Sequence, residues 1–307
     1  MAAHPHTVVL GTDARNLRPC CYTTYSILKN ARGPIQIYLL SIGVEEEDAA
    51  PLNHIVSQFK GATFTHHAVH PSKLDGGQQR MKHITKAAYL RLLIPNFFNQ
   101  RVVYLDSDVM VRKNICTLWD FDLGPNPVGA VVNTAHLAMK YYVKNGRGDI
   151  KKKQESVQKD LAIQAARVGF DDPERYLNSG VLVIDCPALK ADEDLCAKFT
   201  NIKAAGSKRF IMDNDWLIHI LHNKVTWLPP GWNCVRGNVE MTRRYIPQRI
   251  KDYYAPSCKD PAIVHFTGIN KPWDTEHTAG YLVNNPFTEE YRTLMHDCDA
   301  LLATPLI

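Results

Sequence analysis

The segment Arg101–Arg112 reads RVVYLDSDVMVR, in which one apolar run leads into Asp106 and Asp108 and a second apolar run leads away from them. Alternate side chains of an extended chain point to the same side. The two carboxylates should therefore project together, about 7 Å apart at roughly 3.3 Å per residue. They repel each other unless a cation lies between them, and Mg²⁺ and Mn²⁺ prefer oxygen ligands. The segment predicts a metal–diphosphate site at a strand end, with a solvated acidic turn as the alternative.

The composition is that of an ordinary globular protein: 307 residues, 45% of them hydrophobic and 22% charged. No apolar run is long enough to cross a bilayer, and the N-terminus shows no secretory signal. The eight cysteines form no CxxC pair, so we expect reduced thiols and neither a disulfide framework nor a zinc site. The expected location is cytoplasmic, with peripheral association at the cytoplasmic face of a membrane as an alternative.

The net charge of +5 is mild, and no nucleic-acid motif is present. The polar stretch Lys144–Lys159 contains three consecutive lysines and is expected to be a solvated surface segment or a mobile loop. An anionic membrane surface or a charged acceptor would be a partner for such a segment.

Short apolar runs alternate along the chain with segments of helical spacing. We expect strands at 7–12, 35–40, 62–65, 102–105, 128–132, 181–184, 225–228 and 263–266, and helices at 17–30, 45–59, 85–93 and 211–221. This alternation is typical of an α/β fold with one Rossmann-like, mostly parallel sheet flanked by helices. We expect one catalytic domain over residues 1–280 and a smaller C-terminal part, a helical extension over 281–307.

Ligands of such sheets bind beyond the carboxyl ends of the strands. Thr12-Asp13, Asp106–Asp108 and His265–Gly268 each follow a predicted strand end, so we expect them to share one site. In the third segment, His265 offers a nitrogen ligand to the same cation, Gly268 lets the backbone approach a ligand closely, and Lys271 supplies a charge for a phosphate. The alternative is a strand-end turn with a structural histidine and a surface lysine.

Two further polar segments have both a structural and a functional interpretation. Asp213-Asn214-Asp215 precedes Trp216, where an aspartate is first of all a helix N-cap; the functional hypothesis is that Asp213 and Asn214 bind the hydroxyls of a sugar. Asn178-Ser179-Gly180 is either a plain turn or a source of amide groups for a hydroxyl-rich ligand.

Four segments together, Tyr104–Val111, Leu177–Leu182, Asp213–Asp215 and His265–Trp273, resemble the retaining glycosyltransferases of family 8. The similarity is strongest to the bacterial lipopolysaccharide α-galactosyltransferases and α-glucosyltransferases. It covers most of the chain in the expected order. The resemblance implies a GT-A fold, a UDP-sugar donor, a saccharide acceptor of the lipopolysaccharide type, and Mn²⁺ as the cofactor, with Mg²⁺ as the alternative ion.

The resemblance also implies roles for individual residues. The matched positions are Asp106, Asp108 and His265 for the metal; Gly11, Thr12, Asp13, Asn16, Arg91, Ser107, Asn178, Ser179, Gly268 and Lys271 for the nucleotide sugar, together with Asp106 and Asp108; Asp213 and Asn214 for catalysis at the donor sugar; and His83 and Asn133 for the acceptor.

The chain departs from the family pattern at two places. Asn214 stands where the family usually carries glutamine, which can change which hexose fits. Arg15-Asn16-Leu17 stands where the family carries an aromatic residue near the nucleotide base, so base contacts in that loop are expected to differ.

The implied reaction transfers galactose or glucose to an acceptor hydroxyl with retention of the α configuration. Same-face attack, with the leaving phosphate oxygen accepting the proton, is favoured over a covalent intermediate on Asp213. A self-glycosylating enzyme of the glycogenin kind and a non-catalytic nucleotide-sugar-binding relative are the main alternatives. A nucleotidyltransferase would need a glycine-rich basic loop near the N-terminus, which Thr12–Arg15 does not provide.

Overall fold

The computed structural model describes the chain except for residues 1–4, 81–83, 147–150, 275–281, 283–284 and 305–307. Its centre is a seven-stranded sheet in the order β3-β2-β1-β4-β7-β6-β8. The strands are β1 His6–Asp13, β2 Ile35–Ile42, β3 Ala62–Ala68, β4 Arg101–Asp106, β6 Val128–Val132, β7 Leu177–Asp185 and β8 Val225–Trp227. Only β7 runs antiparallel to its neighbours, β4 and β6. The predicted α/β fold with a mostly parallel sheet is confirmed.

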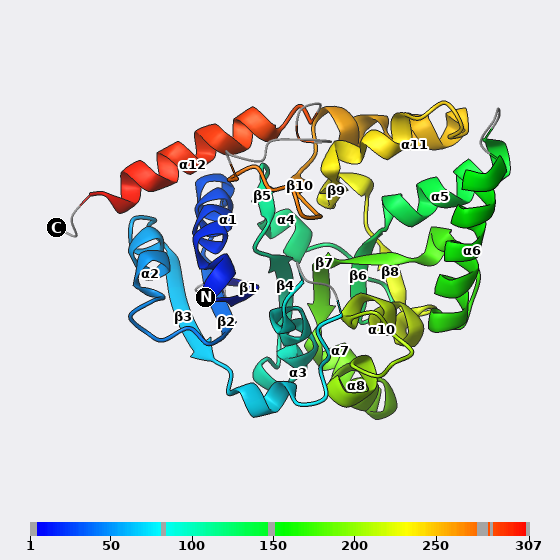
Figure 1. Cartoon of the computed structure of the whole chain (residues 1–307). Coiled ribbons are helices and arrows are strands. Elements are labelled where there is room, and N and C mark those ends of the chain that lie inside the picture. The colour runs from blue at the N-terminus through cyan, green and yellow to red at the C-terminus, as the bar shows by residue number, and fades with distance from the viewer. Residues whose placement is uncertain (1–4, 81–83, 147–150, 275–281, 283–284, 305–307) are drawn as a thin grey trace.

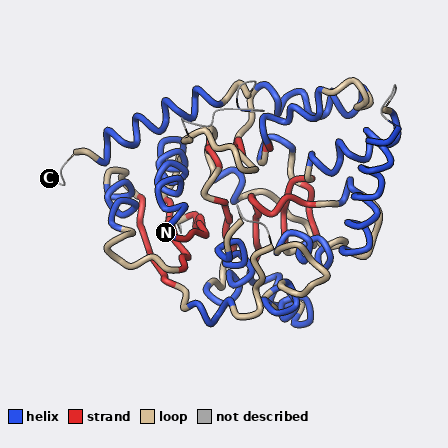
Figure 2. Tube along the Cα trace, viewed as in Figure 1, coloured by secondary structure: helices blue, strands red, loops and turns tan. Residues whose placement is uncertain are grey.

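Helices cover both faces of this sheet, because its strands alternate their apolar side chains between two cores (Figure 2). In β1, Val8 and Leu10 belong to one core and Val9 to the other, and β4 divides its residues in the same way. The first core is closed by α1 Leu17–Asn30, α2 Ala50–Ser57 and α12 Thr288–Leu302; the second is closed by α3 Ile94–Phe97, α7 Cys186–Ala191, α8 Glu193–Phe199, α9 Ile202–Ala205 and α10 Asp213–Leu221.

A second, three-stranded sheet lies beside the first and is built in the order β5-β10-β9. Its strands are β5 Val109–Val111, β9 Cys234–Val235 and β10 Ile263–His265. Only Ser107 and Asp108 separate the end of β4 from the start of β5, so the Asp-x-Asp motif is the junction between the two sheets. The sequence predicts a single sheet, whereas His265 ends a strand of this second one.

The remaining helices are α4 Cys116–Trp119, α5 Thr134–Asn145, α6 Lys151–Val168 and α11 Gln248–Lys259. α12 packs against α1 and α2 along one edge of the molecule (Figure 1). A helix within residues 281–307 is thus present, whereas the division into a domain and an extension stays a prediction. Within the described part of the chain, no helix has both the length and the apolar character of a membrane span.

Three predicted elements differ from the structure. The helix expected at 45–59 begins only at Ala50, because Pro51 lacks an N–H and fits the first turn of a helix. The segment expected as a helix at 85–93 is a 3₁₀ helix, Lys86–Leu93. Lys144–Lys159 is not a loop throughout, since α6 begins at Lys151; its described residues from 153 onward are mostly exposed, as expected for a solvated segment.

Candidate active site

A cavity of about 550 Å³ opens beyond the carboxyl ends of β1 and β4, between the two sheets. It brings together most of the residues predicted from the sequence: Gly11, Thr12, Asn16, Arg91, Asp106, Ser107, Asp108, Asn133, Asn178, Ser179, Asp213, Asn214, His265, Gly268 and Lys271. Asp13 is not among the lining residues. Asp13 is instead the N-cap of the 3₁₀ helix Ala14–Asn16, and its carboxylate accepts hydrogen bonds from the backbone and side-chain nitrogens of Asn16. His83 lies outside the described residues.

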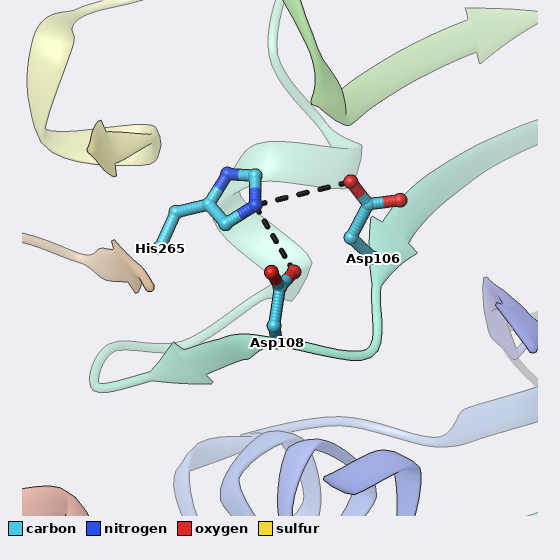
Figure 3. Close-up of side chains that lie close together, drawn as sticks. All are labelled: Asp106, Asp108 and His265. Carbon is cyan, nitrogen blue, oxygen red and sulfur yellow. Dashed lines mark ion pairs between the residues drawn. The ribbon is translucent and has the colours of Figure 1, made fainter. Parts of the chain in front are cut away.

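Asp106, Asp108 and His265 line this cavity and form a cluster of potential metal ligands (Figure 3). The imidazole Nε2 lies 3.1 Å from Asp108 Oδ1 and 3.8 Å from Asp106 Oδ2. Two ligands at right angles around an ion with bonds of about 2.1 Å lie roughly 3 Å apart. One nitrogen and two carboxylate oxygens at this spacing suit a divalent ion such as Mn²⁺ or Mg²⁺. The residues present therefore fit a metal.

Lys271 reaches the same cluster from the loop after β10. Its Nζ lies 2.6 Å from Asp108 Oδ2 and donates to the carbonyl oxygen of Phe266. Burial opposes ionisation of Asp108, but Lys271 and His265 outweigh it and hold the pKa of that carboxyl well below its usual range. Gly268, in the same loop, has φ +98°, a backbone conformation that glycine adopts without strain. The loop thus places a charge beside the aspartates, and at Gly268 the Arg236 side chain packs closely against its backbone.

Arg91 is a buried hub that links the aspartate motif to α10. Its Nη2 lies 2.8 Å from Asp106 Oδ1, its Nε lies 3.1 Å from Asp213 Oδ2, and its Nη1 donates to the backbone carbonyl of Ser179. The guanidinium also stacks over the ring of Tyr104, whose hydroxyl donates to Asp106 Oδ1. Arg91 therefore fixes both carboxylates in place and faces the cavity as well.

The N-cap interpretation of Asp213 is wrong. α10 begins at Asp213, and Met212 occupies the cap position. The start of the helix is instead held by Asp215, whose carboxylate accepts hydrogen bonds from the backbone N–H of Ile211 and from Gln164. Asp213 is left to pair with Arg91, and the side-chain oxygen of Asn214 accepts a hydrogen bond from the backbone N–H of Ser179. The two residues therefore join α10 to β7 beside the cavity.

The cavity and its surroundings also contain residues to which the sequence assigned no role, among them Tyr104, Gly180, Asn233 and Arg236. Gly180 is packed against the metal cluster, because a Cβ at this position would overlap the His265 ring and lie 2.7 Å from Asp106 Oδ2. Asn233 Oδ1 lies 3.0 Å from His265 Nδ1. Tyr104 and Gly180 stood in segments whose neighbours were recognised. Asn233 and Arg236 lie in a stretch with no chemical pattern of its own, so the sequence offered no signal for them.

Replacing Arg91 with methionine should lower the free energy of unfolding by about 3–5 kcal/mol, because two carboxylates lose their buried partner. Urea denaturation of the metal-free protein at neutral pH measures the change. Arg18→Met is the control, since Arg18 pairs with Asp299 where the two side chains are about half and two-fifths exposed, and it should cost about 1 kcal/mol or less. Equal losses for the two variants would contradict the assignment of Arg91 as a buried hub.

Asp213 should make the stability of the metal-free protein depend on pH. Burial raises the pKa of Asp213 to about 6 from the ordinary 3.8, against the opposing effect of Arg91 and with the help of Asp106. The folded state then binds more protons than the unfolded state, so this contribution to stability is present below about pH 4 and is lost as the pH rises through about 6.

The Asp213→Asn variant lacks this titration. Its stability relative to the unmodified protein should therefore rise between about pH 4.5 and pH 7, as measured by urea midpoints of both proteins at each pH. A difference that does not change with pH would show that Asp213 is ionised throughout this range.

Comparisons with known proteins agree with the geometry. General stress protein A of Bacillus subtilis is 28% identical over 218 residues, which cover 68% of this chain and 64% of that protein. The lipopolysaccharide 1,3-galactosyltransferase of Salmonella typhimurium is 25% identical over 198 residues, covering 62% of this chain and 50% of that protein. The chain thus spans about half to two-thirds of the length of these curated relatives.

Among solved structures, galactosyltransferase LgtC in complex with donor and acceptor sugar analogs superposes with a TM-score of 0.67 at 20% identity, covering 98% of this chain and 97% of that one. This likeness establishes the GT-A fold. The family model for glycosyl transferase family 8 matches residues 7–277. Because this match covers most of the chain and the fold agrees with it, the protein belongs to glycosyltransferase family 8.

Proposed function

We propose that this chain is a metal-dependent, retaining glycosyltransferase that moves galactose or glucose from a UDP-sugar to a saccharide hydroxyl in an α linkage. The observation that carries the proposal is the convergence of Asp106, Asp108, His265 and Lys271 on one cavity, with the Arg91–Asp213 pair beside them. Membership of family 8 and the names of its relatives support a nucleotide-sugar donor. A lipopolysaccharide-type oligosaccharide is the proposed acceptor.

Asp106, Asp108 and His265 would hold the divalent ion, which would supply positive charge against the departing diphosphate. Lys271 adds a second positive charge at the same place. Its ammonium group is bound to Asp108 in the structure and lies on a loop that also carries Gly268. A diphosphate entering here can take the ammonium as a hydrogen-bond donor while the backbone at Gly268 lies close to it. Such charge stabilisation is worth several kcal/mol in transferases and hydrolases.

Asp213 and Asn214 are the proposed catalytic residues around the donor sugar. The Asp213 side chain is 4% exposed, and its Oδ2 is engaged by Arg91 and by the Ser179 hydroxyl. A carboxylate held in this way is better placed to orient a sugar hydroxyl than to attack the anomeric carbon. We therefore propose same-face attack, in which the acceptor hydroxyl gives its proton to the leaving phosphate oxygen. Gly11, Thr12 and Asn16 are proposed to contact the nucleoside, and Asn133 the acceptor.

The test incubates the purified protein with UDP-galactose and UDP-glucose, with Mn²⁺, with Mg²⁺ and with a chelator, in the presence of short oligosaccharide acceptors. Release of UDP that requires the metal, together with an α-anomeric signal in the product by NMR, would support the proposal. Turnover of one UDP-hexose and not of the other would identify the donor. Intact mass that rises by whole hexose units would instead indicate self-glycosylation, and tight binding without turnover would indicate a non-catalytic relative.

A cytoplasmic protein that associates peripherally with a membrane fits this proposal, since lipopolysaccharide acceptors are anchored there. The lysine-rich sequence at the start of α6 is the proposed contact.

A further inference from the structure

His265 is held from behind by a buried asparagine that the proposed reaction does not use. Asn233 lies between the 3₁₀ helix Pro230–Trp232 and β9, and it is completely buried. Its Oδ1 lies 3.0 Å from His265 Nδ1, and its Nδ2 lies 2.9 Å from Asn178 Oδ1. Because β9 pairs with β10, the backbone of the second sheet keeps Asn233 beside His265.

The backbone amide of Gly180 fixes the direction of each hydrogen bond in the series that leads to His265. The backbone N–H of Gly180 can only donate, and it donates to Asn178 Oδ1 at 3.0 Å. The Asn233 group that contacts the same oxygen must therefore be its NH₂, which turns Asn233 Oδ1 toward the imidazole. Since that oxygen can only accept, His265 Nδ1 carries the proton. The proton position is thus set by a backbone amide, through two asparagines.

We propose that Asn233 is a positioning residue that keeps the proton of His265 on Nδ1 and so presents the Nε2 lone pair to a divalent cation. Nε2 is the nitrogen that faces the carboxylates, at 3.1 Å from Asp108 and 3.8 Å from Asp106. The proposal rests on the proposed function only in that the ion is a divalent metal. Hydrogen-bond partners of this kind fix the ring and the tautomer of metal-binding histidines.

Removal of Asn233 would free His265 to place its proton on Nε2 and donate it to Asp108, which lies within hydrogen-bond distance. The His265 Nε2 atom and the Asp108 oxygen that accepts its proton would then no longer be free to bind the ion. Asn233→Leu has nearly the same volume without the acceptor, and it should weaken Mn²⁺ binding about 10- to 100-fold. Asn233→Asp keeps an acceptor for Nδ1–H but loses the hydrogen bond to Asn178 Oδ1, and it should retain more Mn²⁺ affinity than Asn233→Leu.

The test measures Mn²⁺ affinity from the electron paramagnetic resonance signal of the free ion, using the full chain. Ser257→Ala is the matched control. Ser257 is a buried polar residue behind the same sheet, where its hydroxyl accepts from Asn238 and donates to the Tyr254 carbonyl, and it lies outside the hydrogen-bond chain to His265. Ser257→Ala should bind Mn²⁺ like the unmodified protein even if its unfolding midpoint falls. Equal affinities for Asn233→Leu and the unmodified protein would overturn the proposal.

A second readout does not depend on the metal. The Nδ1 proton of His265 should give a protected downfield resonance in the metal-free protein, assigned by its loss in His265→Gln, and it should be missing in Asn233→Leu. If the unmodified protein bound no Mn²⁺ but kept this resonance, the proposed function would fail while the role of Asn233 stood. A His265 that carries its proton only on Nε2 would sink the role of Asn233 whatever the metal result.

Discussion

Asp108→Asn should reduce turnover about a thousandfold, which corresponds to roughly 4 kcal/mol of lost transition-state stabilisation. Asp108 contacts both His265 and Lys271, so its loss removes a charged metal ligand and the anionic partner of the lysine together. An amide of the same shape keeps the packing and removes the charge. Mn²⁺ affinity should fall in the same variant, because the cluster then offers a single carboxylate.

Initial rates of UDP release and Mn²⁺ titrations measure the two effects. Asp260→Asn is the control, because Asp260 pairs with Arg112 and Lys113 in the loop before β10, and does not line the cavity. Its rates should match those of the unmodified protein. If Asp108→Asn retained normal turnover and normal Mn²⁺ affinity, the metal-dependent mechanism would be wrong.

Gly180→Ala should be nearly as damaging, although it adds only one methyl group. That methyl would overlap the His265 ring and lie 2.7 Å from Asp106 Oδ2, so the His265 ring must move and Asp106 is crowded as well. A misplacement of about 1 Å in such a site costs on the order of a hundredfold in rate. Overpacking itself costs about 1–3 kcal/mol of stability. We therefore expect a folded, less stable protein that has lost most of its Mn²⁺ affinity and turnover.

Circular dichroism and thermal unfolding would establish that the Gly180→Ala protein folds before its rates are read. Gly33→Ala provides the comparison, because its nearest contact to an added Cβ, the Cys116 sulfur, is at an ordinary 3.4 Å. The Gly33 variant should remain active. Normal activity in Gly180→Ala would mean that His265 and Asp106 can shift without loss of function, and would contradict the proposed need for close packing at Gly180.

The sheet was predictable because each buried strand is a short run of apolar, β-branched residues with a polar group at its end. Asp106 and Asp108 were recognisable for the same reason, since two charges between apolar runs need a partner. The second sheet was not predictable: its strands β5, β9 and β10 have two or three residues each and are paired through long-range contacts. Their pairing places His265, at the end of β10, beside the start of β5 and so beside the aspartates.

Helices α5 and α11 lie where the sequence pattern predicts no element, because each buries only a few residues, in a small core of their own with Met241 and Ile246. The sequence was misleading at Asp213. Its residue type is typical of a helix cap, whereas its buried side chain pairs with Arg91. Propensity describes the local backbone, whereas a buried guanidinium 122 positions earlier in the chain decides where this carboxylate points.

The junction of the two sheets at Ser107 and Asp108 has a mechanical consequence. Asp106 ends a strand of the large sheet, and His265 ends a strand of the small one. An ion bound by both would add a cross-link between two sheets that already share one apolar core and are linked by the hydrogen bond from Asn233 to Asn178. Because an ion held by both sheets would stabilise their folded arrangement, one binding event would both stiffen this part of the molecule and complete the substrate site.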